Sequence, residues 1–468
     1  MRTLRFLFLL LYTVSMYSVF SCQNQIQEEL TVEPGLLAFP GAEGFGANTI
    51  GGRGGEVIKV TNLTDSGPGS FRAAVTASYP RIVVFEISGI INLESNLDIY
   101  NPYLTVAGQT SPGGILVTGY QTLVNTHDVI IRYIRFRVGS HRIADGADPE
   151  NLDAFDIWGD YWGPNKAYNI IVDHSSFSWG VDETFTVSGG VTNTTIQWCI
   201  ISEGLRYAGH PKGEHSKGLM VSGKYAGPNT VSVHHNYIAH NTARNPLISS
   251  PDGVDMIVDL VNNVSYNWKG GLSPENGGTA KTNWIHNYSK QGASSNSYSF
   301  ELQYSNPVSP AIPLIYVYGN IGSTRLSQSD PQWNVGVDWH DELLSESYRQ
   351  LSPWPTESIT TTEISYDYAL EIIENAGATK PFRDSVDIRV VNDFVNTTGD
   401  IIDNITFPDD FPIFPDLPAQ ADTDSDGMPD TWETANGLNP NDASDRNGTN
   451  LSLDGYTNIE IYLNSLVD

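Results

Sequence analysis

The chain has 468 residues and a formal net charge of −29, because 54 Asp and Glu outnumber 25 Lys and Arg. This length accommodates one large domain with an appendage. The negative charge argues against nucleic acid and anionic membrane surfaces as partners, since both repel an acidic protein. An acidic ligand is compatible with this charge where divalent cations reverse it locally.

The first 22 residues have the pattern of an export signal. Two arginines precede the apolar run Phe6–Tyr12, which is too short to span a bilayer as a helix. The segment Val19-Phe-Ser-Cys22 is similar to a lipoprotein cleavage box, so we expect either a lipid anchor at Cys22 or plain cleavage of a signal peptide. Residues 23–37 are polar and acidic and are interpreted as a tether. We therefore expect a secreted protein or a lipoprotein of the outer membrane or cell surface.

Short β-rich runs alternate with Asn, Gly and Ser turns between residue 38 and about residue 330, and helical periodicity is almost absent. From Val129 to Met256 these runs begin at intervals of 25 to 41 residues. One set of short strands per repeat fits a parallel β-helix, whose stacked coils bury a continuous apolar core and whose turn asparagines can stack in ladders. A β-sandwich would need a steadier spacing of about 8–12 residues. We predict an all-β, right-handed, single-stranded parallel β-helix.

Within this region, three acidic segments are candidate cation ligands: Asn151–Asp156, Asp173-His174 and Asp182-Glu183. The alternative is that they are solvated turn acids. Two lysines nearby, Lys212 and Lys217, are candidate contacts for an anionic ligand or plain surface residues. Cys199 lies in an apolar strand and is expected to be a small core residue.

The most distinctive stretch is Val231–Leu247, which contains His234-His-Asn236 and then Arg244-Asn-Pro246. Pro246 biases the preceding residue toward an extended conformation, so we expect the Arg244 side chain to have a fixed direction. The histidines could be metal ligands or bases. We expect them to support the arginine by packing and hydrogen bonding, and we keep His235 as a candidate substrate contact.

Residues 331–405 are less patterned and are interpreted as a peripheral extension of the β-helix. Tyr366–Ala378 is expected to form a short amphipathic helix that ends at a glycine. Residues 406–421 contain four prolines and are interpreted as a linker.

The tail, residues 422–468, begins with a motif that satisfies the EF-hand loop pattern at every position. Its carboxylates would repel one another without a hard cation between them. We therefore predict a calcium ion, with Gly427 forming the turn, and a structural role, because so short a tail scarcely forms a core without metal. A second ion at Asp445, Asn447 and Asp454 is left open. The predicted ligands are Asp422, Asp424, Asp426, Asp430 and Glu433. The loop also resembles the thrombospondin type 3-like calcium repeats of secreted enzymes.

The stretch from His234 to Pro246 resembles the His-His-Asn … Arg-x-Pro signature of the family 1 pectate lyases, and the Phe39–Gly46 segment is similar to their opening. The resemblance covers roughly residues 38–330. It implies that Arg244 is the base that removes the C5 proton of a uronate. It also implies that Lys217 binds substrate, with Lys212 as a competing candidate. The family pattern has a second arginine where this chain has Ser249.

In the same family, carboxylates from consecutive coils converge on a calcium ion that bridges enzyme and substrate. The resemblance implies this role for Asp153 and Asp182, with Glu183 and Asp156 next. A fourth family ligand would fall near Thr186, which is not a carboxylate. We therefore expect a monomeric enzyme that cleaves α-1,4-polygalacturonate by calcium-assisted β-elimination to 4,5-unsaturated oligogalacturonides. Three alternatives stay open: a lyase on another uronate polymer, such as an algal one, a non-catalytic glycan-binding β-helix protein, and a hydrolase with paired carboxylates.

Overall fold

The computed structural model describes residues 35–160, 167–224, 227–251, 253–270, 279–296, 301–303, 314–323, 325–333, 336–337 and 345–467. The predicted export signal, Cys22 and most of the predicted tether lie outside these residues. Residues 35–467 belong to one compact unit. Within the described part of the chain, no helix has both the length and the apolar character needed to cross a bilayer.

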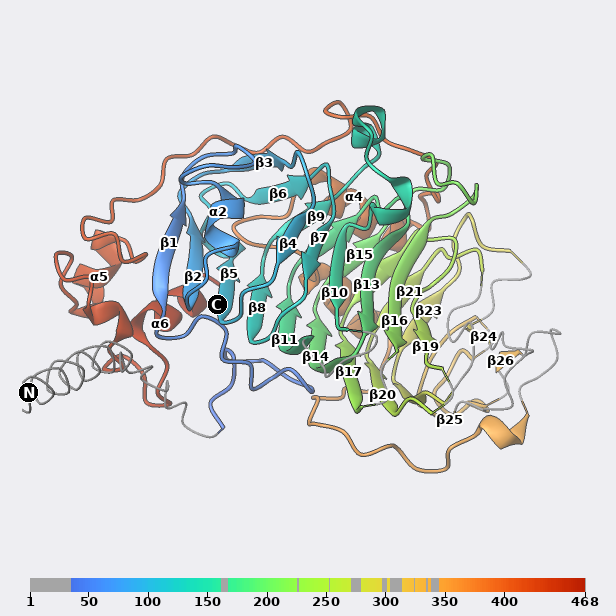
Figure 1. Ribbon diagram of the computed structural model, residues 1–468. Coiled ribbons are helices and arrows are strands. Elements are labelled where there is room, and N and C mark those ends of the chain that lie inside the picture. Colours follow the sequence, from blue (N-terminus) through green and yellow to red (C-terminus); the bar gives the residue numbers. More distant parts are fainter. Residues whose placement is uncertain are drawn as a thin grey trace, which may run out of the picture. The chain divides into compact units, whose positions relative to one another are not determined.

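Three parallel sheets form the sides of a coiled solenoid, so the predicted parallel β-helix is confirmed (Figure 1). The central coils, from β2 to β19, each contribute one strand to each side. Strands of successive coils pair in parallel: Val129 pairs with Ile170, Ile170 with Thr194, and Thr194 with Val231. We call the three sides sheets A, B and C. Sheet A contains β1 (Glu56–Val60), β2 (Arg81–Phe85), β5 (Leu104–Ala107), β8 (Val129–Arg132), β11 (Ala167–Asp173), β14 (Val191–Gln197), β17 (Asn229–His234), β20 (Met256–Val261), β22 (Lys281–Ile285) and β25 (Leu314–Tyr318).

The other two sides are built in the same way. Sheet B contains β3 (Gly89–Asn92), β6 (Ile115–Thr118), β9 (Arg135–Arg137), β12 (Ser176–Ser178), β15 (Ile200–Ser202), β18 (Tyr237–Ala239), β21 (Val264–Tyr266) and β23 (Tyr288–Lys290). Sheet C contains β4 (Leu97–Ile99), β7 (Thr122–Val124), β10 (Phe155–Trp158), β13 (Glu183–Gly189), β16 (Lys217–Gly223) and β19 (Leu247–Ser249). A separate pair joins β24 (Leu302–Gln303) and β26 (Gly336–Val337).

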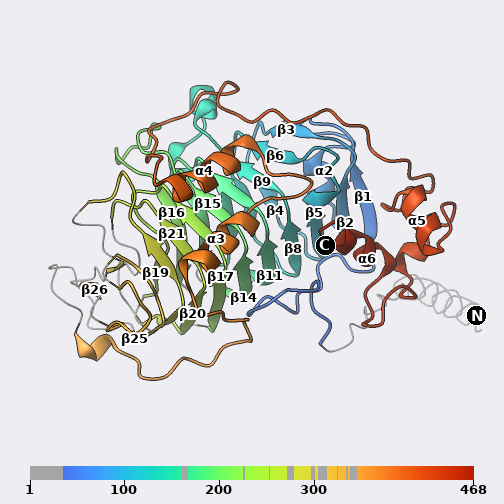
Figure 2. The ribbon, with the colours of Figure 1, turned by 180° about the vertical axis from the view of Figure 1, so that it is seen from behind.

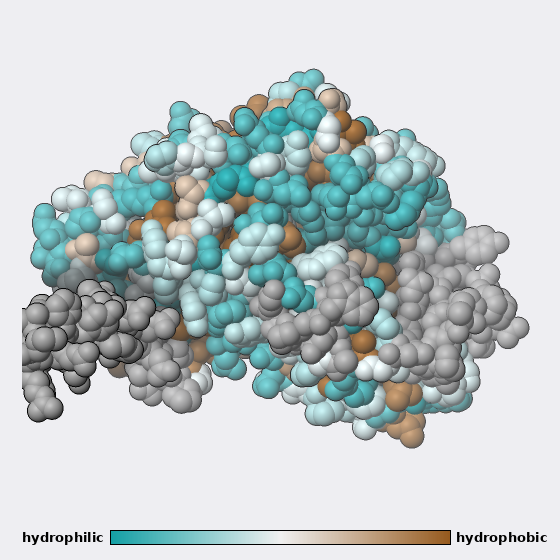
Figure 3. All heavy atoms as spheres, in the orientation of Figure 1, coloured by the Kyte–Doolittle hydropathy of each residue, from teal (hydrophilic) through white to brown (hydrophobic). Residues whose placement is uncertain are grey.

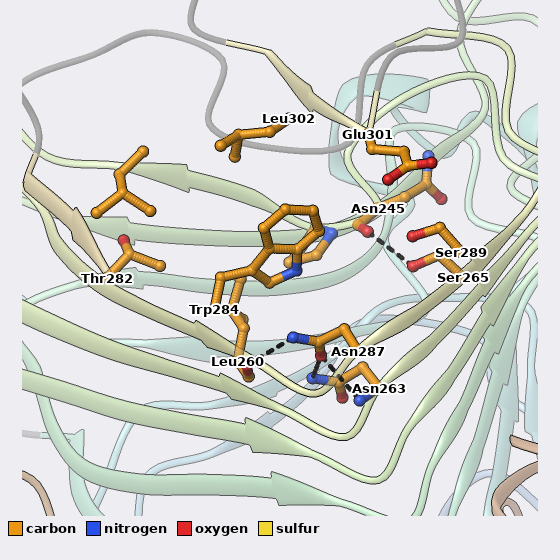
Figure 4. Close-up of a pocket in the computed structure, with 12 residues that line it drawn as sticks. Asn245, Leu260, Asn263, Ser265, Thr282, Trp284, Asn287, Ser289, Glu301 and Leu302 are labelled. Atoms are coloured by element: carbon orange, nitrogen blue, oxygen red, sulfur yellow. Dashed lines mark hydrogen bonds between the residues drawn. The ribbon is translucent and has the colours of Figure 1, made fainter. Parts of the chain in front are cut away.

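An asparagine ladder fixes the turn between sheets A and B, as the sequence predicts. Asn236, Asn263, Asn287 and Asn320 occupy equivalent positions in successive coils. The side-chain oxygens of Asn263, Asn287 and Asn320 each accept a hydrogen bond from the backbone N–H of the preceding asparagine, at 2.8–3.1 Å. The side-chain oxygen of Asn236 accepts from Cys199 N at 2.9 Å. Figure 4 shows Asn263 and Asn287 in this arrangement. The ladder satisfies backbone donors that the turn would otherwise leave buried without partners.

Two helices cover the outer face of sheet B, on the side that Figure 2 shows. α3 (Tyr366–Asn375) lies inside the helix predicted at 366–378, and α4 (Ser385–Asn396) follows it. Both bury apolar side chains against outward-facing residues of the sheet, such as Phe394 against Tyr237 and Tyr266. Asp384 caps α4 and pairs with Arg135 and Arg137 of β9, so a buried ion network ties the helix to the solenoid. The remaining short helices are α2 (Phe71–Val75), η1 (Gly108–Thr110), η2 (His141–Asp145), η3 (Pro149–Asn151) and η4 (Glu346–Tyr348).

The tail packs on the outer face of sheet A at its first coils. It contains α5 (Asp430–Asn436), η5 (Asp445–Asn447) and α6 (Asn458–Ser465). Met428, Ile459 and Leu463 of the tail form an apolar cluster with Ile82 and Val84 of β2. The ion pair of Arg53 with Glu460, at 2.7 Å, borders this contact. The tail therefore covers apolar side chains that β2 would otherwise expose.

Candidate active site and metal clusters

An open groove of ≈ 570 Å³ crosses the outer face of sheet C, over β7, β10, β13 and β16. Leu123, Asp156, Thr186 and Met220 pair in register across these four strands, and all four line the groove. Their sequence neighbours, such as Phe155, point into the core, because side chains alternate between the two faces of a strand. The face of the molecule seen in Figure 3 is predominantly hydrophilic.

A pair of buried carboxyl groups, Asp153 and Asp156, lies at the centre of the groove. Asp153 is 5% exposed, and its two oxygens accept hydrogen bonds of 2.9 Å from Glu183 N and Thr186 Oγ1. Asp156 is 2% exposed; Gln121 donates to its Oδ2, and its Oδ1 has no partner. Burial raises the pKa of Asp153 to about 7. Burial, followed by the charge of Asp153, raises the pKa of Asp156 well above its ordinary value. Such a pair requires a shared proton or a bound cation.

Arg244 contacts this acidic centre through Glu183, whose Oε1 forms an ion pair with its guanidinium. The ligand oxygens of Asp153, Asp182 and Glu183 lie within 4.8 Å of one another. The structure thus brings four of the predicted calcium ligands and the predicted base to one place, from β10, β13 and the loop before β19. The carboxylates come from consecutive coils, and the arginine comes from a third coil.

The backbone at Arg244 is fixed by its neighbours. Arg244 has a left-handed conformation, with φ +62°, and its carbonyl accepts a 2.7 Å hydrogen bond from Leu219 N. Asn245, 1% exposed, accepts hydrogen bonds at its side-chain oxygen from Asn241 and at its backbone carbonyl from Ser265. Figure 4 shows Asn245 and Ser265 joined at the wall of an internal cavity of ≈ 20 Å³. This enclosed cavity has room for about one water molecule and is not a substrate site.

Asp182 lies between the acidic centre and two histidines. His215 Nε2 and His210 Nε2 approach its Oδ1 to 2.6 and 3.3 Å, but neither contact has the angle of a hydrogen bond. Burial disfavours the charge of Asp182, yet the nearby His215, His210 and Arg244 outweigh it and keep its pKa below the ordinary value. Burial and the neighbouring His215 lower the pKa of His210. Neither histidine was predicted from the sequence as a site residue.

The predicted substrate contacts occupy different places. Lys217 begins β16 and pairs in register with Glu183, so it lies one coil beyond the acidic centre. Lys212 is exposed and forms a 3.4 Å ion pair with Glu150 at the rim of the groove. Lys224, which the sequence did not indicate, lines the groove.

His235 is not brought to the groove. It is 2% exposed, stacks on Trp198 and contacts the Tyr368 hydroxyl of α3 at 3.0 Å. Burial lowers its pKa to about 4. Cys199 is also buried, as expected for a small core residue.

Calcium fits the donor set in the groove. The clustered donors of Asp153, Asp182 and Glu183 are carboxylate oxygens, which are the ligands that Ca²⁺ prefers. Asp156, which lies beside Asp153, has its Oδ1 buried without a hydrogen-bond partner. Among the described residues that line the groove, the acidic side chains are Glu150, Asp153, Asp156, Asp160, Asp182 and Glu183. Such a groove repels an acidic polymer unless cations are bound in it.

The tail forms a second acidic site. Asp422, Asp424 and Asp426 make one group of ligand atoms within 4.8 Å, and Asp426, Glu433 and Asp445 make another. Glu433 is fully buried, and neither of its side-chain oxygens has a hydrogen-bond partner. Burial raises the pKa of Glu433 to about 8 and that of Asp426 to about 7. The predicted ligand Asp430 lies in neither group, and its two carboxylate oxygens instead accept 2.7 Å hydrogen bonds from Thr423.

Comparison with known proteins decides the family. The chain is 36% identical over 454 residues to probable pectate lyase C of Emericella nidulans, with 92% of this chain and 93% of that protein covered. It is 35% identical over 444 residues to probable pectate lyase C of Aspergillus fumigatus, with 92% and 94% covered. The chain belongs to the pectate lyase family. This lyase acts on polysaccharide, and it is an enzyme rather than a silent glycan-binding protein.

A solved structure supports the fold of the lyase. Jun a 1, the major allergen from cedar pollen, matches with a TM-score of 0.53 and 17% identity, over 72% of this chain and 92% of that chain. At this identity the likeness shows the shared fold alone. No family model matches the chain.

Proposed function

We propose that this lyase cleaves α-1,4-linked polygalacturonate by β-elimination, with Arg244 as the base that takes the C5 proton. The relatives named as pectate lyases support the substrate, since the chain covers nearly their whole length. The observation that carries the proposal is the contact of Arg244 with Glu183, in the acidic centre of the groove that crosses sheet C.

In this reaction the base takes the C5 proton, a C4–C5 double bond forms and the bond from C4 to the bridging oxygen breaks, and the departing oxygen takes a proton from water to become a hydroxyl group. The carbanion that develops at C5 lies beside the uronate carboxylate, so positive charge there lowers the barrier. Glu183 orients the Arg244 guanidinium, and the fixed backbone of Arg244 limits its motion. A free arginine has a pKa above about 12, so its neutral form, which can accept a proton, becomes populated only as the pH rises into the alkaline range. We therefore expect activity to rise with pH.

We further propose that Asp153, Asp156, Asp182 and Glu183 hold a calcium ion. When bound, it supplies positive charge for the uronate carboxylate and for the charge that develops next to it. The unpartnered Asp156 oxygen and the raised pKa values of the Asp153–Asp156 pair support this assignment. Lys217, Lys212 and Lys224 are proposed to bind further uronate carboxylates. Ser249 lies in register with Ser222 and Ser188 on the same face, where the family pattern has a cation.

Substitution of Arg244 tests the proposal. Arg244→Ala and Arg244→Lys should each lower kcat on polygalacturonate by about 100-fold or more, the range for loss of a positioned base. The exposed Arg349, paired with Glu346, provides the matched control, and Arg349→Ala should keep full activity. An Arg244→Ala variant that folds and retains more than about a tenth of the wild-type rate would remove Arg244 from the chemistry. Activity on another uronate polymer, with none on polygalacturonate, would change the substrate and keep the reaction.

We also propose that the tail binds calcium at Asp422, Asp424, Asp426 and Glu433, with Asp445 in place of Asp430 as a direct ligand. The buried, unpartnered carboxylate of Glu433 supports an ion at this position. The role is structural, because the tail covers apolar residues of β2. Export, by a signal peptide or a lipid anchor at Cys22, and a monomeric state remain parts of the proposal.

A further inference from the structure

Two buried histidines and an aspartate meet at the edge of the groove. His210 and His215 are each 5% exposed, and their rings stack with centroids 3.8 Å apart. Their Nε2 atoms and Asp182 Oδ1 lie within 4.8 Å of one another. The three residues come from two coils, because Asp182 precedes β13 and His215 precedes β16, the next strand of sheet C.

The contacts within this cluster are close but are not hydrogen bonds. Each Nε2 lies within 3.3 Å of the same carboxylate oxygen, and each is buried without a hydrogen-bond partner. Residues that bind one metal ion bring their ligand atoms close together, with the lone pairs directed at the ion and not at one another. Here two imidazole nitrogens without a hydrogen-bond partner lie this close to one carboxylate oxygen.

We propose that Asp182, His210 and His215 form a metal site for a divalent ion of the zinc class. Imidazole nitrogen suits Zn²⁺, Co²⁺ and Ni²⁺, whereas calcium takes oxygen ligands. Two histidines and one carboxylate form a three-ligand set that leaves coordination positions open for water or a substrate oxygen. The site is thus different in kind from the acidic centre, although the two share Asp182.

Sharing Asp182 makes the two sites interdependent. An ion on the histidine side adds positive charge next to Asp153 and Glu183, and it draws on a carboxylate that also belongs to their group. Because linkage is reciprocal, calcium in the groove must then change the affinity for the zinc-class ion by the same factor. The site holds for this chain whichever uronate polymer is the substrate.

Metal binding requires one local change. The Nδ1 atom of His210 accepts a 3.2 Å hydrogen bond from Lys212 N, which assigns the proton of the neutral ring to Nε2. To bind a metal through Nε2, His210 must carry its proton on Nδ1 instead. Lys212 is exposed, so water can take over the hydrogen bond from its N–H when the tautomer changes.

Cobalt provides a direct test, because its visible spectrum reports coordination. The full chain, without a polyhistidine tag, is freed of metal with chelator and then equilibrated with excess calcium to fill the oxygen sites. Titration with Co²⁺ should show one bound equivalent with a ligand-field spectrum, and Zn²⁺ should displace it. His210→Gln and His215→Gln should each weaken binding by more than about tenfold.

The control is His127→Gln. His127 also has a ring nitrogen 2.8 Å from a carboxylate, that of Asp128, but no second histidine joins it in a metal-ligand group of the described residues. This variant should bind Co²⁺ as the wild type does. Absence of bound Co²⁺, or affinity unchanged in both histidine variants, would overturn the proposal. X-ray absorption of the zinc-loaded wild type decides the matter without a variant: two imidazole ligands are expected, and a shell of oxygen alone would overturn the site.

Discussion

Thr186 donates a 2.9 Å hydrogen bond from its hydroxyl to Oδ2 of Asp153, across neighbouring coils of the groove. The backbone N–H of Glu183 donates a hydrogen bond to the other oxygen of the same carboxylate. Both bonds orient Asp153 and stabilise its charged form against burial. A threonine therefore stands where the family resemblance implies a fourth carboxylate, and it contributes a hydrogen bond instead of a charge.

Thr186→Asp should tighten the groove site for calcium. The variant loses the hydrogen bond to Asp153 but adds a fourth nearby carboxylate, and calcium affinity rises with ligand charge. The calcium concentration for half-maximal activity should fall by about tenfold. Ser188→Asp, the next outward position on β13, is the matched control, since it also lines the groove. An equal change in both variants would mean that added charge alone, and not ligation, is responsible.

Asp384→Asn should destabilise the fold by about 3–5 kcal/mol, because it leaves Arg135 and Arg137 buried without their main counter-charge. Asparagine is itself a good N-cap, so the cap of α4 is retained and the charge is isolated. Chemical denaturation measures the change. Asp367→Asn, an exposed first-turn acid of α3, should change stability by less than about 0.5 kcal/mol.

The effect of Asp384→Asn on stability has a predicted pH dependence. Burial opposes the charge of Asp384, but Arg137 and Arg135 outweigh it and hold the pKa well below its ordinary value. A lowered pKa contributes stability that is present above the unfolded value of about 3.9 and is lost as the pH falls below it. The difference between wild type and Asp384→Asn should thus be constant at neutral pH and shrink only below about pH 4. A difference that shrinks between pH 5 and pH 8 would contradict this assignment.

Calcium removal should lower the melting temperature, and more so at higher pH. Without an ion, the buried Glu433 and Asp426 have pKa values raised to about 8 and about 7. A raised carboxyl pKa means that stability is lost as the pH rises from about 4 through these values. The drop on adding chelator should grow between about pH 6 and pH 9, as measured by thermal unfolding.

Glu433→Gln separates the tail from the groove in that measurement. Without calcium at high pH it should be more stable than the wild type, because it removes a buried charge, and it should gain little from calcium. Asp409→Asn, an exposed acid before the tail, should behave as the wild type does. A chelator effect that is independent of pH and unchanged in Glu433→Gln would place the stabilising ion elsewhere.

Much of the fold could be predicted from the sequence because each coil repeats the same local chemistry. The asparagines at Asn236 and Asn263 mark the turns of later coils, and the apolar runs between such turns mark the strands. Helix α4 was not predicted, because Val386–Val395 is rich in β-branched residues, which favour strands. Its signals were the capping Asp384 and the buried set Val386, Val390 and Phe394, which recurs every four residues.

Only those site residues that belong to a recognisable sequence motif could be predicted. Arg244 and the carboxylates near Asp153 and Asp182 were found through the family signature, and the coil register brings them together. His210 and His215 have no such signature. They lie 28 and 33 residues after Asp182 in the chain, and only the pairing of β13 with β16 puts them beside it. His235 was a candidate substrate contact because it shares a motif with Arg244. The two residues lie on different sides of the coil, so the motif does not bring His235 to the groove.

The ultraviolet absorbance of unsaturated uronate, followed in a mixture of the lyase and polygalacturonate at alkaline pH, tests the central claim most directly. The account predicts that absorbance rises in calcium, that chelator stops the rise, and that Arg244→Ala abolishes it while Arg349→Ala does not. New reducing ends without any rise in absorbance would show hydrolysis and would contradict β-elimination by this groove.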